Sequence, residues 1–313
     1  MKTIAQYVKD GINTIQDLQD ALQTAMQLEF ATIPPYLCAQ WSINDNDDPD
    51  DVDGMIQDIV VQEMYHFALA GNILTAIGGT PDIANSAFIP QYPTNTLPGG
   101  IAQKLAVDLK PLSLDQLQVF MQIEYPEFTP VALAARAAGP ATIGAFYDTI
   151  ADALTALNPP INSAAFSVNM KEAVPITTVT GAVAAISRIK AEGEGTQGSP
   201  DQPPADGVKF AHYYVFKEIF TGKALQQTNG QWGFTGAQIQ FPTVYNFAPS
   251  TQKPDPSTTF NQTLSQLLVD LQTCWTSGAP PNVGTMFTLQ SLGQGLIQQQ
   301  GIRPGFVWAT PAA

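Results

Sequence analysis

Charged residues are scarce in this chain of 313 residues: they make up 13% of it, against about 25% in a typical soluble domain. Basic residues are the scarcer kind, because 13 Lys and Arg stand against 27 Asp and Glu, which gives a formal net charge of -14. Nucleic-acid binding depends on basic side chains that contact phosphates. We therefore exclude nucleic acid as a partner.

Long apolar runs are also absent. No stretch reaches the roughly 18 apolar residues of a transmembrane helix, and the first residues, MKTIAQY, lack the apolar segment of a signal peptide. The only cysteines, Cys38 and Cys274, are too few for a disulfide framework, and we expect both to be reduced. The sequence thus predicts a cytoplasmic protein that does not enter a membrane.

Histidine is equally rare, with only His66 and His212 in the chain. His66 lies in a stripe of residues spaced by three and four, as on one face of an α-helix: Ile56, Ile59, Glu63, His66, Ala70 and Ile73. A carboxylate and an imidazole on a buried face are costly unless they have partners. Glu-x-x-His is also the spacing that supplies metal ligands in four-helix di-iron carboxylate bundles.

Three more glutamates continue apolar stripes on other predicted helices. Glu29 lies on a helix that we expect to be the first, beginning at Thr14 and kinked or ended by Pro34-Pro35. Glu124 lies near the end of a helix that begins at Ser113, and Glu194 at the end of a helix over 178–194.

His212 lies in a further apolar stripe, over 208–219. Other helices are predicted over 52–77, 143–157, 258–276 and 283–299, separated by proline-rich segments. The aspartates of 44–53 lack the glycine of a calcium-binding EF-hand loop, so we expect a solvated connection there. The predicted fold class is all-α: a helical bundle with a metal site over 1–225, and a C-terminal extension over 226–313 whose two helices pack on it.

The polar residues in these stripes make up the inventory of a two-metal carboxylate site. We expect Glu29, Glu63 and His66 to bind one metal and Glu124, Glu194 and His212 to bind the other, with Glu63 and one further glutamate as bridges. Carboxylate and imidazole ligands suit iron or manganese. Tyr36 and Glu127 are candidates to contact the ligands, Glu218 is a reserve ligand, and no residue is assigned a catalytic role.

Each of these residues also has a plain structural interpretation. A glutamate in a stripe can lie at its edge with the carboxylate in solvent, and a histidine can be a hydrogen-bonded core residue. What favours a metal site is the coincidence: both histidines and Glu29, Glu63 and Glu124 fall on otherwise apolar helix faces, in a chain with few charges.

Several segments resemble one family: EFATIPPYL from Glu29, EMYH from Glu63, GGTP from Gly78, Ile123-Glu124, TIGAFY from Thr142, GEG from Gly193 and AHYY from Ala211. Over roughly 15–225 the chain is similar to the ferritin-like family that includes the iminophenyl-pyruvate dimer synthases. The N-terminal region of the bis-indole synthases of violacein and rebeccamycin biosynthesis belongs there too. Two positions depart from the pattern: Lys209 replaces the glutamate of a second Glu-x-x-His, so Glu194 must substitute, and position 145, often acidic, is Ala145.

The resemblance implies a ferritin-like four-helix bundle and oxidative work on amino-acid-derived or other natural-product precursors. Our leading hypothesis is a di-iron or Fe/Mn oxidoreductase that uses dioxygen or peroxide on a small, amino-acid-derived or aromatic substrate. A homo-oligomer is one of the assemblies that the sequence leaves open. Alternatives are a metal storage or detoxification protein, a metal-free scaffold in a biosynthetic complex, and a haem-binding variant, since the bis-indole synthases contain haem.

Overall fold

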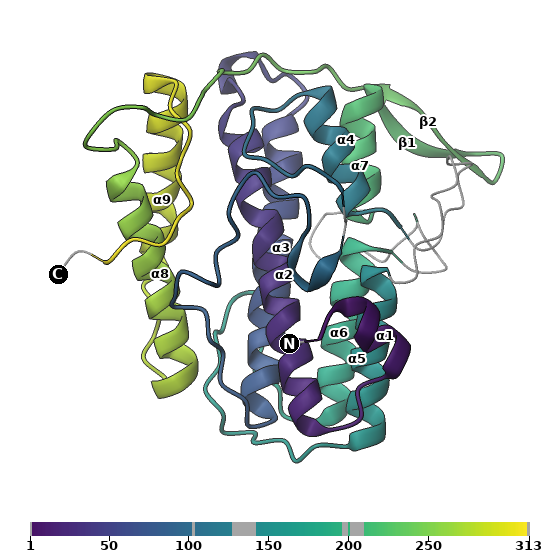
Figure 1. The fold of residues 1–313 in the computed structure, drawn as a ribbon. Helices are drawn as coiled ribbons and strands as arrows, with labels where there is room; N and C mark the ends of the chain where they lie inside the picture. The colour runs from purple at the N-terminus through teal and green to yellow at the C-terminus, as the bar shows by residue number, and fades with distance from the viewer. Residues whose placement is uncertain (1, 102–103, 127–141, 196–199, 201–209, 312–313) are drawn as a thin grey trace.

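The computed structural model describes residues 2–101, 104–126, 142–195, 200 and 210–311, and it is mostly helical (Figure 1). Its α-helices are α1 (Ile4–Asp10), α2 (Ile15–Trp41), α3 (Val52–Ala76), α4 (Leu114–Ile123), α5 (Ile143–Leu157), α6 (Val179–Gly193), α7 (His212–Thr221), α8 (Thr258–Ser277) and α9 (Gly284–Gln294). A π-helical turn, Gly295–Gln299, continues α9, and short 3-10 turns lie at Asp45–Asp47 and Pro98–Gly100. None of the described helices is long and apolar enough to cross a membrane.

The two longest helices, α2 and α3, lie side by side at the centre of the molecule (Figure 1). Four shorter helices pack on them as two pairs, α4 with α7 and α5 with α6. In Figure 1 the first pair lies above the second, so that the ends of the short helices come together halfway along α2 and α3. The bundle therefore has two long continuous helices and two interrupted ones.

Several helices begin where the sequence predicts. The hydroxyls of Thr14, Ser113 and Thr178 accept hydrogen bonds from backbone N–H groups in the first turns of α2, α4 and α6. Such side chains satisfy N–H groups that have no partner within the helix. The acidic segment 44–53 is a connection that caps α3, because Asp48 accepts from the N–H of Val52 at 2.9 Å. The structure adds the short helix α1, which precedes the predicted first helix.

Of the two effects predicted for Pro34-Pro35, a kink or an end of the first helix, the end is wrong, since α2 runs unbroken to Trp41. Proline lacks an N–H, so Pro35 leaves the carbonyl of Ala31 without its helical partner. The hydroxyl of Tyr92 donates to that carbonyl at 2.7 Å, which replaces the missing bond. The prolines are also buried in the bundle, where packing stabilises a helix more than local propensity does.

An antiparallel hairpin, β1 (Lys223–Thr228) and β2 (Gln231–Gln238), follows α7 in a region where the sequence shows no periodicity. Its turn residues, Asn229 and Gly230, have positive φ angles of 52° and 77°. Asn-Gly is the favoured pair for such a two-residue turn. The hairpin has few buried side chains, which explains why no alternating apolar pattern announces it.

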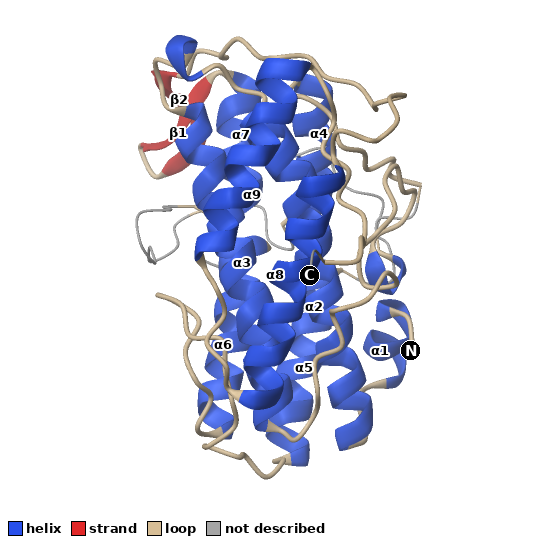
Figure 2. Ribbon diagram, turned by 90° about the vertical axis from the view of Figure 1, so that its left-hand side faces the viewer, coloured by secondary structure: helices blue, strands red, loops and turns tan. Residues whose placement is uncertain are grey.

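The C-terminal helices α8 and α9 lie on the opposite side of α2 and α3 from the short helices (Figures 1 and 2). The indole of Trp275 in α8 packs directly over Gly71 of α3, and its N–H donates to the side-chain oxygen of Asn72 at 2.8 Å. In the same way, Gly293 of α9 faces the indole of Trp41 at the end of α2. Both contacts need a glycine, because a Cβ would overlap the ring.

Candidate metal centre

The six predicted ligands are all buried inside the bundle, with exposed fractions of 5% or less: Glu29, Glu63, His66, Glu124, Glu194 and His212. They come from five helices or the residues that cap them. Glu29 and Glu63 lie on α2 and α3, whereas Glu124 and Glu194 cap the C-termini of α4 and α6. His212 is the first residue of α7. The ends of α4, α6 and α7 thus place polar side chains next to the same part of α2 and α3.

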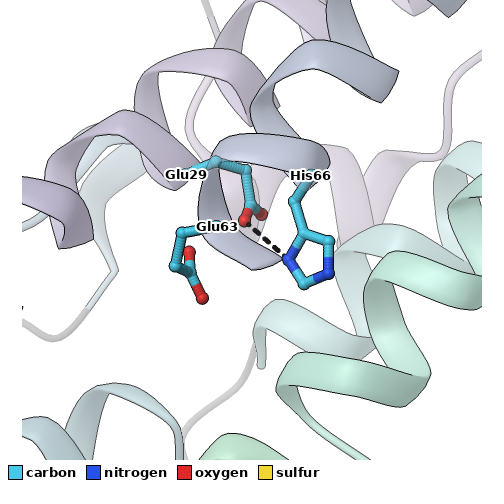
Figure 3. A group of neighbouring side chains, drawn as sticks. All are labelled: Glu29, Glu63 and His66. Atoms are coloured by element: carbon cyan, nitrogen blue, oxygen red, sulfur yellow. Dashed lines mark ion pairs between the residues drawn. The ribbon is translucent and has the colours of Figure 1, made fainter. Parts of the chain in front are cut away.

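One group of three side chains, which we call the His66 position, consists of Glu29, Glu63 and His66 (Figure 3). A ligand atom of each lies within 4.8 Å of the others. His66 Nδ1 is 3.3 Å from Glu29 Oε2. Glu63 and His66 reach it together because residues three apart share a face of α3.

The second group, the His212 position, consists of Glu63, Glu124 and His212, again with ligand atoms within 4.8 Å of one another. His212 Nδ1 lies 2.8 Å from Glu63 Oε1 and 3.6 Å from Glu124 Oε2. Glu63 belongs to both positions. A carboxylate that two such groups share could contact both of two metals, which is the role that the sequence interpretation gives it.

Three other predicted candidates have different places. Glu194 lines the cavity between the two positions but belongs to neither group of three. The third member of the His212 position is Glu63, not Glu194 as predicted. Glu218 accepts a hydrogen bond from the backbone N–H of Leu225 at 2.6 Å, so it joins α7 to β1. Glu127 lies outside the described residues.

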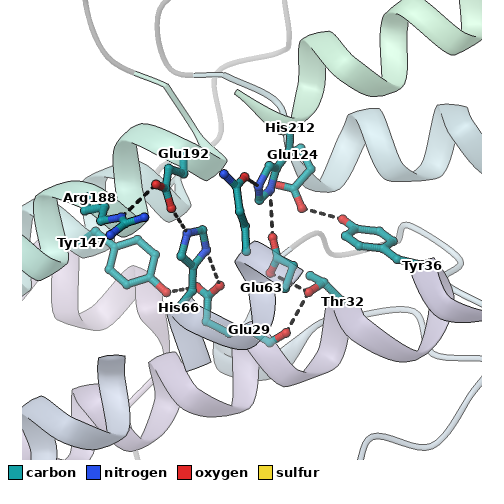
Figure 4. Close-up of polar contacts among 11 residues, drawn as sticks. Glu29, Thr32, Tyr36, Glu63, His66, Glu124, Tyr147, Arg188, Glu192 and His212 are labelled. Carbon is teal, nitrogen blue, oxygen red and sulfur yellow. Dashed lines mark hydrogen bonds and ion pairs between the residues drawn. The ribbon is translucent and has the colours of Figure 1, made fainter. Parts of the chain in front are cut away.

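Each imidazole has a partner on its outer side (Figure 4). His66 Nε2 lies 2.9 Å from Glu192 Oε2, and His212 Nε2 lies 2.9 Å from Gln62 Oε1. Both partners are acceptors, so each ring carries a proton on Nε2 and turns Nδ1 inward. Metal-binding histidines are oriented in this way, with the second nitrogen donating to a carboxylate or carbonyl oxygen.

The inward nitrogen of His212 is a direct test of whether the site fits a metal. His212 Nδ1 is fully buried and forms no hydrogen bond of acceptable geometry among the described residues, and its near neighbours are the carboxylates of Glu63 and Glu124. A buried polar atom that makes no well-formed hydrogen bond is costly. A cation between this nitrogen and the adjacent carboxylates satisfies it, so the donor set fits a metal ion.

Hydroxyl groups hold the three carboxylates of the two positions (Figure 4). Tyr147 donates to Glu29 Oε1, Tyr36 donates to Glu124 Oε1 at 2.5 Å, and Thr32 donates to Glu63 Oε2 at 2.8 Å. Tyr36 is the residue that the sequence offers as a ligand contact. Four others are missed: Thr32, Gln62, Tyr147 and Glu192. Of these, Thr32 has a signal in its spacing, since it lies one turn beyond Glu29 on the same helix.

The buried carboxylates raise the pKa values of their neighbours when no metal is bound. Burial raises the pKa of Glu63 to about 7, and the charge of Glu124 adds to the rise. Burial alone lowers the pKa of an imidazole, but the Glu192 carboxylate lifts that of His66 to about 9. Glu124 and Glu63 lift the pKa of His212 to about 10. The raised pKa values favour a second proton on both rings when no metal is bound, and a metal would have to displace it.

A cavity of about 20 Å³ is lined by five of the predicted ligands, namely Glu29, Glu63, His66, Glu124 and Glu194. This is room for ions or about one water molecule. A haem needs a pocket of several hundred Å³, on the order of a drug-sized ligand site. The described residues around the two histidines, which are 1% and 0% exposed, leave no such space.

The fold and the cluster define a class: a helical bundle with buried Glu/His groups that can bind metal ions. The family model described as ferritin-like matches residues 22–221. That match spans more than half of the chain, and the chain belongs to the ferritin-like family.

A solved structure shares the fold. The crystal structure of a ferritin-like protein from Caulobacter vibrioides is 23% identical, with a TM-score of 0.67, over 96% of this chain and 99% of that chain. A comparison with the curated proteins finds no match.

Proposed function

We propose that this protein is a dinuclear metal oxidase or oxygenase, with two iron ions or one iron and one manganese, that acts with dioxygen or peroxide on a small precursor molecule. The observation that carries the proposal is Glu63, whose carboxylate belongs to two groups of potential ligands, each completed by a glutamate and a histidine. Carboxylate and neutral imidazole ligands suit iron and manganese.

The metals, when bound, would supply redox chemistry and act as Lewis acids. The chain's own residues would hold them in place. The outer hydrogen bonds of His66 and His212 direct both Nδ1 atoms inward, and the hydroxyls of Tyr36 and Tyr147 hold the glutamates at the two ends. Burial of the whole cluster keeps bulk water away, so the electrostatic interactions inside are strong.

The class of substrate rests on the resemblance to the iminophenyl-pyruvate dimer synthases, which supports an amino-acid-derived or other natural-product precursor. The cavity itself holds no more than the metals and a small ligand. Its apolar wall residues are Leu28, Ile123, Ile143 and Ile189, beside the hydroxyl groups of Thr32 and Tyr147. A substrate of that size would have to approach the metals from outside this cavity.

Elemental analysis of protein expressed with ample iron tests the proposal. We expect about two first-row metals per chain in the wild type, and one or fewer in His212→Ala. The control variant Gln57→Ala, which changes an exposed residue of α3, should keep the wild-type content. A content well above two metals per chain would indicate storage, and protein without bound metal under these conditions would refute the proposal.

A further inference from the structure

The two metal positions match each other almost contact by contact. They share Glu63. The glutamate at each end accepts a hydrogen bond from a buried tyrosine, Tyr147 at the His66 position and Tyr36 at the His212 position. Each histidine turns Nδ1 inward, and the two rings are stacked 5.8 Å apart. Such symmetry by itself predicts two positions of similar affinity.

The outer partners of the histidines break this symmetry. Glu192, a carboxylate, lies 2.9 Å from His66 Nε2, whereas the neutral amide oxygen of Gln62 lies 2.9 Å from His212 Nε2. A carboxylate that accepts the outer N–H makes the imidazole a stronger donor through its other nitrogen. It also places one more negative charge beside the His66 position.

Arg188 does not cancel that charge. Its Nε lies 2.8 Å from Glu192 Oε1, but its guanidinium also pairs with Glu172 (Figure 4 shows the Glu192 contact). Two carboxylates therefore share one guanidinium, which leaves a net negative charge. Glu194 lines the cavity between the two positions and belongs to neither group of three, so we do not assign its charge to one of them.

We propose that the two metals bind in sequence: the His66 position fills first, and it binds a given divalent ion about 10- to 100-fold more tightly than the His212 position, the range typical of outer hydrogen-bond partners. The site can consequently hold two different metals, with the second position open to whichever ion is available. This inference rests on the proposed two-metal function and makes Glu192 a positioning residue that acts through His66.

A titration of metal-free protein with Mn²⁺ alone, without oxygen, tests the order of binding. Electron paramagnetic resonance distinguishes free, singly bound and spin-coupled paired Mn²⁺. With one equivalent added, we expect mostly the singly bound form, and the coupled signal should grow only with the second equivalent. Equal, independent positions would instead give a mixture of empty, singly and doubly loaded chains.

Two variants identify which position fills first. His212→Ala should keep the tight binding step and lose the weak one. His66→Ala should lose the tight step and bind, at most, one ion weakly. The reverse pattern, or equal losses in the two variants, would overturn the inference.

Glu192→Gln isolates the cause. It keeps the size of the side chain and an acceptor oxygen for His66 but removes the charge, so the first step should weaken by about 10- to 100-fold and approach the second. Glu172→Gln removes the same unit of charge from the group around Arg188 but does not contact His66, so it separates the effect of the charge from that of the hydrogen bond. It should change either affinity only a few-fold.

The outcomes separate this inference from the function on which it rests. If the wild type binds two ions with equal affinity, or if Glu192→Gln leaves the two steps as they are, the sequential inference is wrong and the two-metal site stands. If the wild type binds no Mn²⁺ or iron, both are wrong.

Discussion

Among single residues, Glu63 has the most demanding place, because it is the one side chain common to both metal positions. It is 2% exposed, and its two oxygens have separate duties: Oε1 faces His212 and Oε2 accepts from Thr32. Burial makes its ionised form costly without a cation, as the pKa of about 7 indicates. Its loss should therefore affect the site differently from the loss of any other ligand.

We predict that Glu63→Gln reduces bound metal from about two per chain to near zero. The neutral amide lacks the negative charge with which a carboxylate bridges two cations. Glu29→Gln, which removes a ligand from the His66 position alone, should retain about one metal. Elemental analysis of both variants after identical loading decides the matter. Equal retention in the two variants would show that Glu63 does not bridge.

The residues of the site differ in how visible they are in the sequence. Glu63 and His66 stand out because they interrupt an apolar stripe on one helix. Glu192 does not, because its role depends on the packing of α6 against α3. The sequence around Glu192 indicates only an ion pair with Arg188, which lies four residues earlier on the same helix, and Glu192 does form that pair. Partners from different helices are fixed by tertiary structure, which periodicity does not report.

At the scale of elements, the close approach of α9 to α2 depends on Gly293. A Cβ at this position would overlap the indole of Trp41, whereas a Cβ at Gly295, two residues further on, has no neighbour within 4 Å among the described residues. The pair offers a matched comparison, since both residues lie in helical conformation and differ in what they face.

We expect Gly293→Ala to lower the free energy of unfolding by about 1–3 kcal/mol, the usual cost of overpacking. Gly295→Ala should leave it unchanged or raise it by about 0.5–1 kcal/mol, since alanine restricts the unfolded chain. Urea denaturation measures both. A Gly293→Ala protein as stable as the wild type would mean that α9 does not pack on α2 as closely as described.

Helix positions were largely predictable, and the exceptions have local causes. The caps at Thr14, Ser113 and Thr178 mark the true starts of α2, α4 and α6. Pro34-Pro35 does not end α2, because the hydroxyl of Tyr92 replaces the missing hydrogen bond to the carbonyl of Ala31. Tyr92 is far along the chain, so the local sequence does not indicate this contact. In the hairpin, Asn229-Gly230 was a usable turn signal, but the exposed strands beside it carry no apolar alternation.

For the whole molecule, metal binding and pH should be coupled. His66 and His212 have pKa values raised to about 9 and 10 in the metal-free protein, well above the usual 6.5. Their protonated forms stabilise the metal-free fold fully below about pH 6.5, and this contribution is lost as the pH rises through 9 to 10. The raised pKa of Glu63 acts in the same direction between about pH 4.5 and 7.

A metal must displace the protons on Nδ1 of both rings, so its affinity should rise with pH. We predict a larger increase in Tm on addition of Mn²⁺ at pH 8.5 than at pH 6, together with proton release into a weak buffer at pH 7. Differential scanning calorimetry and a pH electrode suffice. A Tm increase that is independent of pH, without proton release, would contradict the assignment of the two imidazoles as ligands.

The central claim is that two metals share Glu63 inside this bundle, and a crystal structure of the metal-loaded protein with anomalous diffraction tests it most directly. We predict two anomalous peaks about 3.5–4 Å apart, as in other two-metal sites. Glu63 should contact both, and each should be bound by Nδ1 of one histidine, His66 or His212. A single peak, or two peaks of which Glu63 contacts only one, would contradict the account.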